Sequence, residues 1–478
     1  MINTSGDLLT DLYTKNIIAE HFPEFCFSDT LHIECRSSVI TSESSVTANI
    51  CINEKNYTCT EKYSDHMNNR LATTCALGKA VIEFSKSKSR QIAPYGVLTG
   101  VRPFKITVDL LARYDYDEVI KRLKKTYLVS DDKIDLLLNT AMYDQKIRMS
   151  HQKNDVSVYI SIPFCPTRCN YCSFISSAAP SKLEILDAYI DELICEINAV
   201  SEMISKKNLN LKSIYIGGGT PTVLTASQLQ KLLCQVNRSF RCDSLLEFTV
   251  EAGRPDTIDA EKLDIIKKAE VSRICVNCQS TDNNVLNAIG RKHTAEEFFK
   301  AFQLVDNYDF DTVNTDIIAG LDTDTFDSFK KTVDDVLALR PDSITVHTLC
   351  IKKSASLRSN DNGVLSKNID DYISYAKSSC IFEGFLPYYL YKQKYSIGNH
   401  ENVGYCQASH ECHYNIAMMN EIEHVFGIGA GATSKILGSR NDGKIEHFAN
   451  FKYPTEYIGG SEKVHSNIIA MEALLEQN

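Results

Sequence analysis

The chain has 478 residues, a formal net charge of −10 and 17 cysteines. Its length allows two or three domains with substantial cores, and its acidic balance argues against a nucleic-acid-binding surface, which needs a basic patch. No apolar run approaches the roughly 20 residues of a membrane span, and the first residues lack the basic and apolar regions of a secretory signal. Because the cysteines are scattered over a long chain, we expect a reduced, cytoplasmic protein in which most of them are small buried side chains.

Residues 1–150 are predicted to form a separate α+β domain. An alternating stretch at 47–57 predicts β-strands, and stretches at 72–85, 117–130 and 134–149 predict helices. The segment at 94–103, PYGVLTGVRP, has the glycines and prolines typical of a turn. We expect this domain to precede a larger core that begins near residue 151.

Between residues 151 and 355, short β-branched runs alternate with amphipathic stretches. The predicted strands lie at 156–162, 213–216, 246–251, 273–277, 312–318 and 343–348. The predicted helices lie at 184–202, 226–237, 259–268, 295–305 and 324–339. Such alternation is typical of consecutive βαβ units in a parallel sheet, so the chain is predicted to be α/β with a partial (β/α)6 barrel. Residues 356–478 are predicted to form a C-terminal α+β extension that covers the substrate, with a glycine-rich segment at 426–432.

Three cysteines follow the first predicted strand of this barrel, in the sequence FCPTRCNYC: Cys165, Cys169 and Cys172. Three thiolates within eight residues can converge on one centre if the segment loops around it, and thiolates are the ligands that iron–sulfur clusters prefer. A four-iron cluster held by three cysteines keeps one iron open for a non-protein ligand, whereas a structural zinc site closes its fourth position with a protein ligand. The alternatives are three ordinary cysteines or part of a zinc site.

The spacing of these cysteines, the preceding strand and Tyr171 before the last cysteine resemble the radical S-adenosylmethionine (SAM) superfamily. The resemblance implies a [4Fe–4S] cluster on Cys165, Cys169 and Cys172, with SAM on its open iron. It also implies reductive cleavage of SAM to a 5′-deoxyadenosyl radical, which requires a site enclosed from water.

Glycines and polar residues stand at the ends of the later predicted strands. Gly217-Gly-Gly-Thr-Pro-Thr222 follows the second strand and lacks the Lys-Ser/Thr of a phosphate loop. Glu251 ends the third strand, Gln279 follows the fourth, Arg291 lies twelve residues further on, and Asp316 lies on the fifth strand. In this order the residues resemble the oxygen-independent coproporphyrinogen III dehydrogenase family, the HemN/HemW/HemZ group. Stretches at 98–103, at 389–394 with 398–399, and at 402–405 resemble its HemZ branch.

This resemblance implies a set of residues around one or two SAM molecules. Tyr159 would pack near the cofactor, and the turn after the second strand would meet its amino group. The implied cofactor-binding residues are Tyr159, Tyr171, Gly218, Gly219, Thr220, Glu251, Gln279, Arg291 and Asp316. An alternative for Arg291 and Asp316 is an ion pair with each other across neighbouring strands.

The family also implies a function. We expect an oxidoreductase of porphyrin and haem biosynthesis that decarboxylates two propionates of coproporphyrinogen III to vinyl groups, giving protoporphyrinogen IX, in an anaerobic setting. We expect a tetrapyrrole substrate, an electron donor such as flavodoxin or ferredoxin, no nucleic-acid or membrane partner, and a monomer. The alternatives are a non-catalytic haem-binding carrier of the same family and a radical SAM enzyme that acts on haem or another tetrapyrrole.

Three positions depart from the family pattern. The dehydrogenase branch has a fourth cysteine where this chain has Phe174, as in the haem-carrier branch, and Ser161 stands where the family usually has a histidine. Both departures bear on decarboxylation. Conversely, the histidine of the haem-carrier segment before the C-terminal glycines is missing, because that stretch begins at Tyr414, although His413 is one residue away.

Three further groups could carry chemistry. Cys275 and Cys278 have metal-ligand spacing, but residues three apart on a strand point to opposite faces, which favours core cysteines. A denser group could form an accessory metal or haem site or a solvated loop; it consists of His400, Cys406, His410, Cys412 and His413. A tyrosine group could line a flat macrocycle pocket or form a hairpin core; it consists of Tyr388, Tyr389, Tyr391 and Tyr395.

Overall fold

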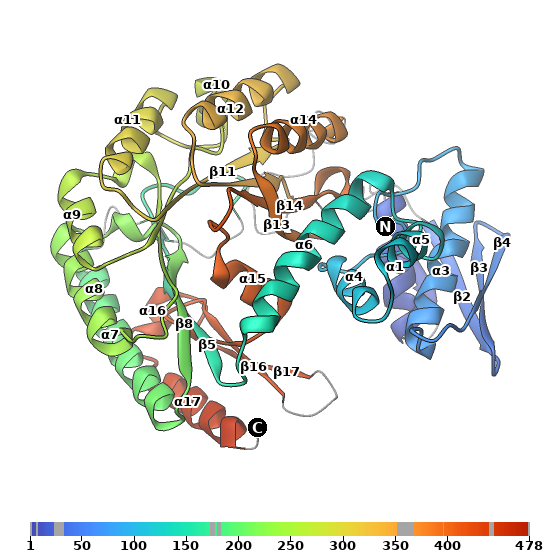
Figure 1. The fold of residues 1–478 in the computed structure, drawn as a ribbon, viewed down its shortest axis with the longest axis horizontal. Helices are drawn as coiled ribbons and strands as arrows, with labels where there is room; N and C mark the ends of the chain where they lie inside the picture. Colours follow the sequence, from blue (N-terminus) through green and yellow to red (C-terminus); the bar gives the residue numbers. More distant parts are fainter. Residues whose placement is uncertain are drawn as a thin grey trace. The chain divides into compact units, whose positions relative to one another are not determined.

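The computed structural model describes residues 2–5, 8–22, 33–172, 177–178, 183–350, 368–394, 396–438 and 444–476. The chain forms two compact units (Figure 1). The first unit comprises residues 1–142 with 390–402, and the second comprises 143–389 with 403–478. The division into three domains at residues 150 and 355 remains a prediction.

The first unit is built on a four-stranded sheet. Its strands, in spatial order, are β1 (Ile2–Ser5), β2 (Ile33–Thr41), β3 (Ser45–Ile52) and β4 (Lys55–Lys62). β1 runs parallel to β2, and the other neighbours are antiparallel. Alternate residues of β3 are buried, as expected for a sheet with one face on a core, and α3 (Asn69–Ser87) packs on β3 and β4. The other helices of this region are α1 (Leu8–His21), α4 (Phe104–Leu111), α5 (Tyr116–Lys125) and α6 (Asp131–Ser150).

The sequence predictions for this region are confirmed in part. The alternating stretch at 47–57 falls on β3 and β4, and the helices expected at 72–85 and 134–149 lie within α3 and α6. The helix expected at 117–130 ends earlier, at Lys125, because Leu128 has a φ of 57° that no helix interior accommodates. β1, β2, α1 and α4 were not predicted.

A short segment from the C-terminal part of the sequence completes the first unit. The backbone N–H of Lys392 donates to the carbonyl of Val101 at 2.8 Å, and the Lys392 ammonium contacts Glu20 at 3.0 Å. The ammonium of Lys133 contacts the buried Glu401 carboxylate at 2.8 Å. Two stretches that resemble the HemZ branch, 98–103 and 389–394, are therefore neighbours in the fold.

The second unit contains the predicted parallel sheet. Six neighbouring strands follow one another in chain order: β5 (Asp155–Ile162), β8 (Asn210–Gly218), β9 (Glu247–Gly253), β10 (Arg273–Val276), β11 (Thr312–Ala319) and β12 (Ser343–Thr348). All adjacent pairs among them are parallel. β5, β9 and β11 are buried along nearly their whole length, which is typical of a parallel sheet covered on both faces. All six predicted strands are confirmed.

Helices cover the outer side of this curved sheet (Figure 1). They are α7 (Leu183–Lys206), α8 (Ala226–Phe240), α9 (Ala260–Lys268), α10 (Asn283–Ala288), α11 (Ala295–Asp306), α12 (Phe326–Ala338) and α14 (Ile369–Phe382). Several begin at sequence-encoded caps: Thr225 and Gln228 form a reciprocal capping box on α8, and Thr294 and Glu297 form one on α11. The predicted α/β architecture, with helices outside a parallel sheet, is confirmed.

The C-terminal region extends the sheet at both edges. β13 (Leu386–Lys392) and β14 (Glu401–Cys406) follow β12, and β14 is antiparallel to it. At the other edge, β15 (His424–Ile428) runs parallel to β5 and is followed by β16 (Thr433–Leu437) and β17 (Ile445–Ala449). The remaining helices are α15 (His413–Asn420), α16 (Pro454–Tyr457) and α17 (Ser461–Glu476). α15 lies on the inner side of the sheet (Figure 1).

Candidate cluster and cofactor site

The predicted site residues lie on neighbouring strands of the parallel sheet or on the segments that follow them. Cys165 lies on the short strand β6 (Phe164–Cys165), which follows β5. The glycine turn follows β8, Glu251 is near the end of β9, and Asp316 lies on β11. Because these strands are parallel, their carboxyl-terminal ends all lie on the same side of the sheet. This is the side on which α/β barrels carry their active sites.

The cysteine loop is held by its neighbours. Cys169 is buried and Cys165 and Cys172 are half-buried, and the Cys172 N–H donates to the Cys169 carbonyl at 3.2 Å. Asn170 ties the loop to α10 through its backbone N–H, 3.1 Å from the Ile289 carbonyl. Three thiols on one anchored loop fit a cluster with three protein ligands. No group of three His, Cys, Asp or Glu side chains within the described ranges could hold a single metal ion, and Phe174 lies outside those ranges.

A second tie to the loop comes from Arg254, a buried residue that the sequence did not indicate. Its Nη1 donates to the Thr167 hydroxyl at 2.8 Å, and both ends of its guanidinium contact Asp256 at 2.9 Å. A bidentate carboxylate fixes the plane of the guanidinium. Arg254 therefore sets the position of the loop between the first and second cysteines.

The glycine turn packs directly on the cysteine strand. The Gly219 N–H donates to the Ile162 carbonyl and the Thr220 N–H to the Phe164 carbonyl, each at 2.8 Å. A Cβ on Gly219 would lie 2.4 Å from the Phe164 oxygen, so only glycine fits there, and Gly218 has a φ of 108°. The Thr220 hydroxyl lies 3.5 Å from the Cys165 sulfur.

A stack of tyrosines occupies the inner side of the sheet beside Glu251. Tyr159 and Tyr215 are register partners on β5 and β8, with ring centroids 6.1 Å apart, and Tyr414 of α15 stacks on Tyr215 at 4.7 Å. The Tyr215 hydroxyl donates to Glu251 at 2.5 Å. Burial raises the pKa of Glu251 to about 7; the Tyr215 hydrogen bond opposes this rise and the Asp316 charge adds to it. Glu251 therefore changes its charge near neutral pH.

Asp316 is held by three neighbours. Asn314 donates to its carboxylate at 2.9 Å, His347 of β12 lies 3.6 Å away, and the Asp316 backbone N–H donates to the Asn277 side chain at 3.1 Å. Burial alone would raise the pKa of Asp316, but the hydrogen bond and charge of His347 outweigh it and lower the pKa. Asp316 is therefore a fixed negative charge at the strand ends.

Gln279 and Arg291 carry buried polar atoms without protein partners. Gln279 is 7% exposed, its N–H donates to the Asp316 carbonyl at 3.0 Å, and its side-chain oxygen has no hydrogen-bond partner. Arg291 donates to the Asn277 carbonyl at 2.7 Å and hydrogen-bonds Tyr171, yet its Nε has no partner. Such orphaned groups are costly unless a ligand satisfies them, so they fit a site that binds a polar cofactor.

The alternative that Arg291 and Asp316 form an ion pair with each other is wrong. Arg291 hydrogen-bonds Tyr171, and the ionic partner of Asp316 is His347. Sequence reasoning missed His347, Tyr215 and Tyr414. A usable signal existed for Tyr215, which stands between the buried Ile214 and Ile216 on β8; His347 gave none, because β12 also carries buried serine and threonine.

The other cysteine and histidine groups serve the core. Burial raises the pKa of Cys278 to about 12, and that of the equally buried Cys275 above its usual range, as expected of core thiols. Cys412 donates to Glu247 at 3.1 Å, His410 contacts the Thr312 hydroxyl at 3.0 Å and His413 contacts Glu423 at 3.4 Å. These separate contacts favour structural polar residues over an accessory metal or haem site.

The tyrosine group favours the hairpin-core interpretation. Tyr388 and Tyr389 are buried against Gly404 of β14, where a Cβ would lie 2.0 Å from a Tyr389 ring carbon. Tyr391 belongs to the first unit, and Tyr395 lies outside the described residues. The two tyrosines of the second unit therefore fill the space that the glycine leaves.

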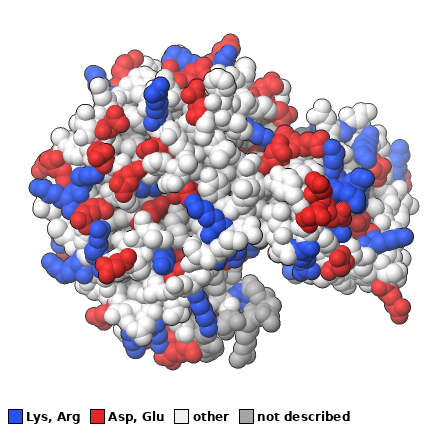
Figure 2. All heavy atoms as spheres, in the orientation of Figure 1, with Lys and Arg blue, Asp and Glu red and all other residues white. Residues whose placement is uncertain are grey.

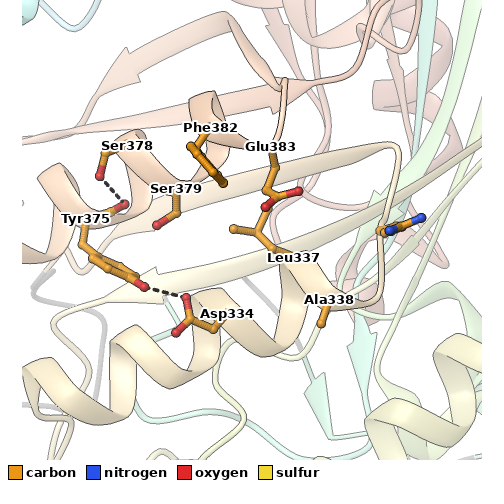
Figure 3. Close-up of a pocket in the computed structure, with 9 residues that line it drawn as sticks. Asp334, Leu337, Ala338, Tyr375, Ser378, Ser379, Phe382 and Glu383 are labelled. Carbon is orange, nitrogen blue, oxygen red and sulfur yellow. Dashed lines mark hydrogen bonds between the residues drawn. The ribbon is translucent and has the colours of Figure 1, made fainter.

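The described part of the surface has mixed charge and a pocket lined by residues other than the predicted site residues. Basic and acidic side chains intermingle over the face drawn in Figure 2. A pocket on the outer side of the sheet lies between α12 and α14, where Tyr375 donates to Asp334 at 2.6 Å and Phe382 is exposed (Figure 3). None of the predicted site residues lines it. Among the described helices, none is both long and apolar enough to cross a membrane.

The fold and the cysteine loop define a radical SAM protein. Residues 159–336 match the family model of the radical SAM superfamily, and this stretch contains the cysteine loop and most of the parallel sheet. The cofactors of the protein are accordingly a [4Fe–4S] cluster and SAM.

Comparisons with known proteins narrow this class. The chain is 37% identical to the oxygen-independent coproporphyrinogen-III oxidase-like protein HemZ of Bacillus subtilis, over 76% of this chain and 74% of that protein. It is 30% identical to the haem chaperone HemW of the same organism, over 61% of this chain and 74% of that protein. The solved structure of coproporphyrinogen III oxidase (HemN) from Escherichia coli shares the fold, with a TM-score of 0.53 and 20% identity over 68% of this chain and 72% of that one. The chain belongs to the family of oxygen-independent coproporphyrinogen III oxidase-like radical SAM proteins.

Proposed function

We propose that the protein is an oxidoreductase that converts propionate side chains of coproporphyrinogen III to vinyl groups, giving protoporphyrinogen IX. The observation that carries this proposal is the 37% identity to a coproporphyrinogen-III oxidase-like protein over three quarters of the chain. It is supported by the carboxyl-terminal side of the sheet, where a three-cysteine loop lies against a glycine turn and where the half-buried carboxylates Glu251 and Asp316 are also located.

The proposed roles follow from these positions. Cys165, Cys169 and Cys172 hold the cluster. The backbone of Gly218, Gly219 and Thr220, which the cysteine strand fixes, meets the amino group of SAM. The polar groups around SAM come from several strands and the segments that follow them; they are Tyr159, Tyr171, Glu251, Gln279, Arg291 and Asp316.

When bound, the cluster and SAM supply a carbon-centred radical that can abstract a hydrogen atom. For each propionate, loss of one hydrogen atom, one carbon dioxide and one electron leaves a vinyl group, so the reaction also needs a one-electron acceptor. The protein's own contribution is to orient SAM and exclude water. Asp316 and Glu251 provide acceptors for hydroxyl and ammonium groups, and α15, whose Tyr414 stacks on Tyr215, lies on the inner side of the sheet.

Anaerobic turnover tests this proposal. Reconstituted protein with SAM, a low-potential reductant, a one-electron acceptor and coproporphyrinogen III should release carbon dioxide and form vinyl porphyrinogen with 5′-deoxyadenosine. Cys169→Ser should abolish the cluster absorbance and the activity, whereas Cys195→Ser, at an exposed position on α7, should change neither. If the protein consumed haem and not coproporphyrinogen III, the proposed substrate would be wrong and the protein would be a radical SAM enzyme that acts on haem.

A haem carrier is the second candidate, favoured by the 30% identity to HemW and by Phe174 at the position of the fourth cysteine. It predicts stoichiometric haem binding without product formation in the same incubation. Under either candidate we propose a cytoplasmic monomer, and for the oxidoreductase we also propose a flavodoxin- or ferredoxin-type electron donor.

A further inference from the structure

We propose that Thr220 tunes the reduction potential of the cluster by donating a hydrogen bond from its hydroxyl to the Cys165 thiolate. The two atoms, Oγ1 and Sγ, are 3.5 Å apart, a normal separation for a hydrogen bond to sulfur. This inference requires a cluster on Cys165 and is independent of the tetrapyrrole reaction. It assigns the Thr220 side chain to the cluster, whereas the cofactor role proposed above concerns the backbone of the turn.

The backbone holds this hydroxyl in place. The Thr220 N–H donates to the carbonyl of Phe164, the residue next to Cys165, and Gly219 lies so close to the Phe164 backbone that no side chain fits between them. Thr220 is 1% exposed, and its side chain lies beside Gly253, where a Cβ would be 3.7 Å from the threonine methyl carbon. The hydroxyl therefore approaches the sulfur in a packed site, with little freedom to turn toward water.

The electrostatic consequence follows from the charge of the cluster. Adding one electron makes the cluster and its thiolates more negative, and a hydrogen bond to a ligand sulfur stabilises that reduced state. The effect is stronger in a buried site, where water does not screen the dipole. Loss of the hydroxyl should therefore make the cluster harder to reduce and shift its potential to more negative values.

The chain offers a matched control two residues away. Thr222 is also 1% exposed, and its hydroxyl donates to the Ala252 carbonyl at 2.6 Å and contacts Thr257. Removing this hydroxyl also removes a buried hydrogen bond from the same turn. In contrast to Thr220, the bond that is lost ends on a backbone oxygen and not on a cysteine ligand.

The test is an anaerobic redox titration of the reconstituted protein without SAM, in which the electron paramagnetic resonance signal of the reduced cluster is followed. Four proteins are compared at equal iron content: the wild type, Thr220→Val, Thr220→Ser and Thr222→Val. Valine keeps the shape of threonine without the donor, and serine keeps the donor. We expect Thr220→Val to titrate at a more negative potential, and Thr220→Ser and Thr222→Val to titrate near the wild type.

An unchanged potential in Thr220→Val would overturn the proposal, and so would an equal negative shift in Thr222→Val, which would indicate general loosening of the turn. Thr220→Val could also fail to retain the cluster while Thr220→Ser and Thr222→Val retain it. That result would support the hydroxyl–thiolate contact, because it would show that the hydroxyl stabilises Cys165 as a ligand of the cluster. Turnover plays no part in the readout, so a failure of the proposed coproporphyrinogen reaction leaves this result intact.

Discussion

Asp316 illustrates how a single side chain in this site is set by its neighbours. Asn314 and His347 fix its carboxylate and keep it ionised, so it can accept hydrogen bonds from a ligand without first losing a proton. We expect Asp316→Asn to retain full iron content and the cluster spectrum. Its binding of SAM should weaken by about 1–3 kcal/mol, the usual cost of losing a hydrogen bond to a charged group, as measured by equilibrium binding.

The control for this change is Asp191→Asn, at an exposed carboxylate paired with Lys231 on the outer helices. It should bind SAM as the wild type does. If Asp316→Asn also bound SAM normally but unfolded at a lower temperature, Asp316 would be a structural residue and would leave the proposed site.

Glu251 gives the site a pH dependence whose sign can be worked out. Burial raises its pKa to about 7 in the folded protein, above its usual value near 4.5. A carboxyl group with a raised folded pKa retains its proton, so its contribution to stability is fully present below about pH 4.5 and is lost as the pH rises through 7. Glu251→Gln removes this titration. The stability of Glu251→Gln relative to the wild type should therefore increase between pH 5 and pH 8, on the order of 1–2 kcal/mol, in thermal unfolding without SAM. Equal differences at both pH values would contradict the raised pKa.

At the scale of elements, the glycine turn and the cysteine strand act as one rigid piece. A methyl group on Gly219 would lie 2.4 Å from the Phe164 carbonyl oxygen, and backbone, unlike a flexible side chain, cannot move aside cheaply. We expect Gly219→Ala to displace β6 and to lower the iron retained after reconstitution several-fold. Gly459→Ala, at a position where a Cβ meets nothing within 4 Å, should retain the wild-type iron content.

The glycine-rich turn after β15 is held by a buried carboxylate of α7. Glu196 accepts hydrogen bonds from the Gly429 N–H at 2.8 Å, the Asn450 amide at 2.7 Å and the Tyr457 hydroxyl at 2.6 Å. Glu196→Ala leaves three buried donors without their acceptor, which should cost on the order of 3 kcal/mol or more. Hydrogen exchange should accelerate at residues 427–432 and 450–457. Glu202→Ala, at an exposed position on the same helix, should leave hydrogen exchange there unchanged. If these residues stayed protected from exchange in Glu196→Ala, Glu196 would not be what holds the glycine-rich turn.

An element can be predicted from the sequence only if its residues show a regular pattern of apolar and polar positions. The six core strands were predicted because buried parallel strands are continuous β-branched runs, and the polar residues that follow them were expected to meet at one edge. Contacts between strands were not predictable, since they depend on register: Tyr159 opposite Tyr215, or His347 beside Asp316, requires knowing which residues are partners. β15 and α15 were missed because short elements with mixed composition leave little periodicity.

At the scale of the whole molecule, the two units are not consecutive in the sequence. The first unit includes residues 390–402, and its buried ion pair joins Lys133 to Glu401 at 2.8 Å. Removing one partner of a buried pair leaves a buried charge without its counterion, so Lys133→Ala should destabilise the protein by about 3–5 kcal/mol. The double variant Lys133→Met, Glu401→Leu should lose much less. Thermal unfolding of the single and the double variant measures the two losses of stability. Equal losses would show that the packing of these side chains, and not the charge of the pair, determines the stability.

The position of β15 has a consequence for how the protein is made. β5, which leads into the cysteine loop, is flanked by β8 on one side and by β15 on the other, and β15 lies more than 260 residues further along the chain. Contacts of such long sequence separation form late and slow the folding of a chain. During synthesis β5 therefore lacks its second neighbour until residues 424–428 have left the ribosome. We therefore expect iron and sulfide to be loaded onto the cysteine loop only after β15 has been synthesised and has paired with β5.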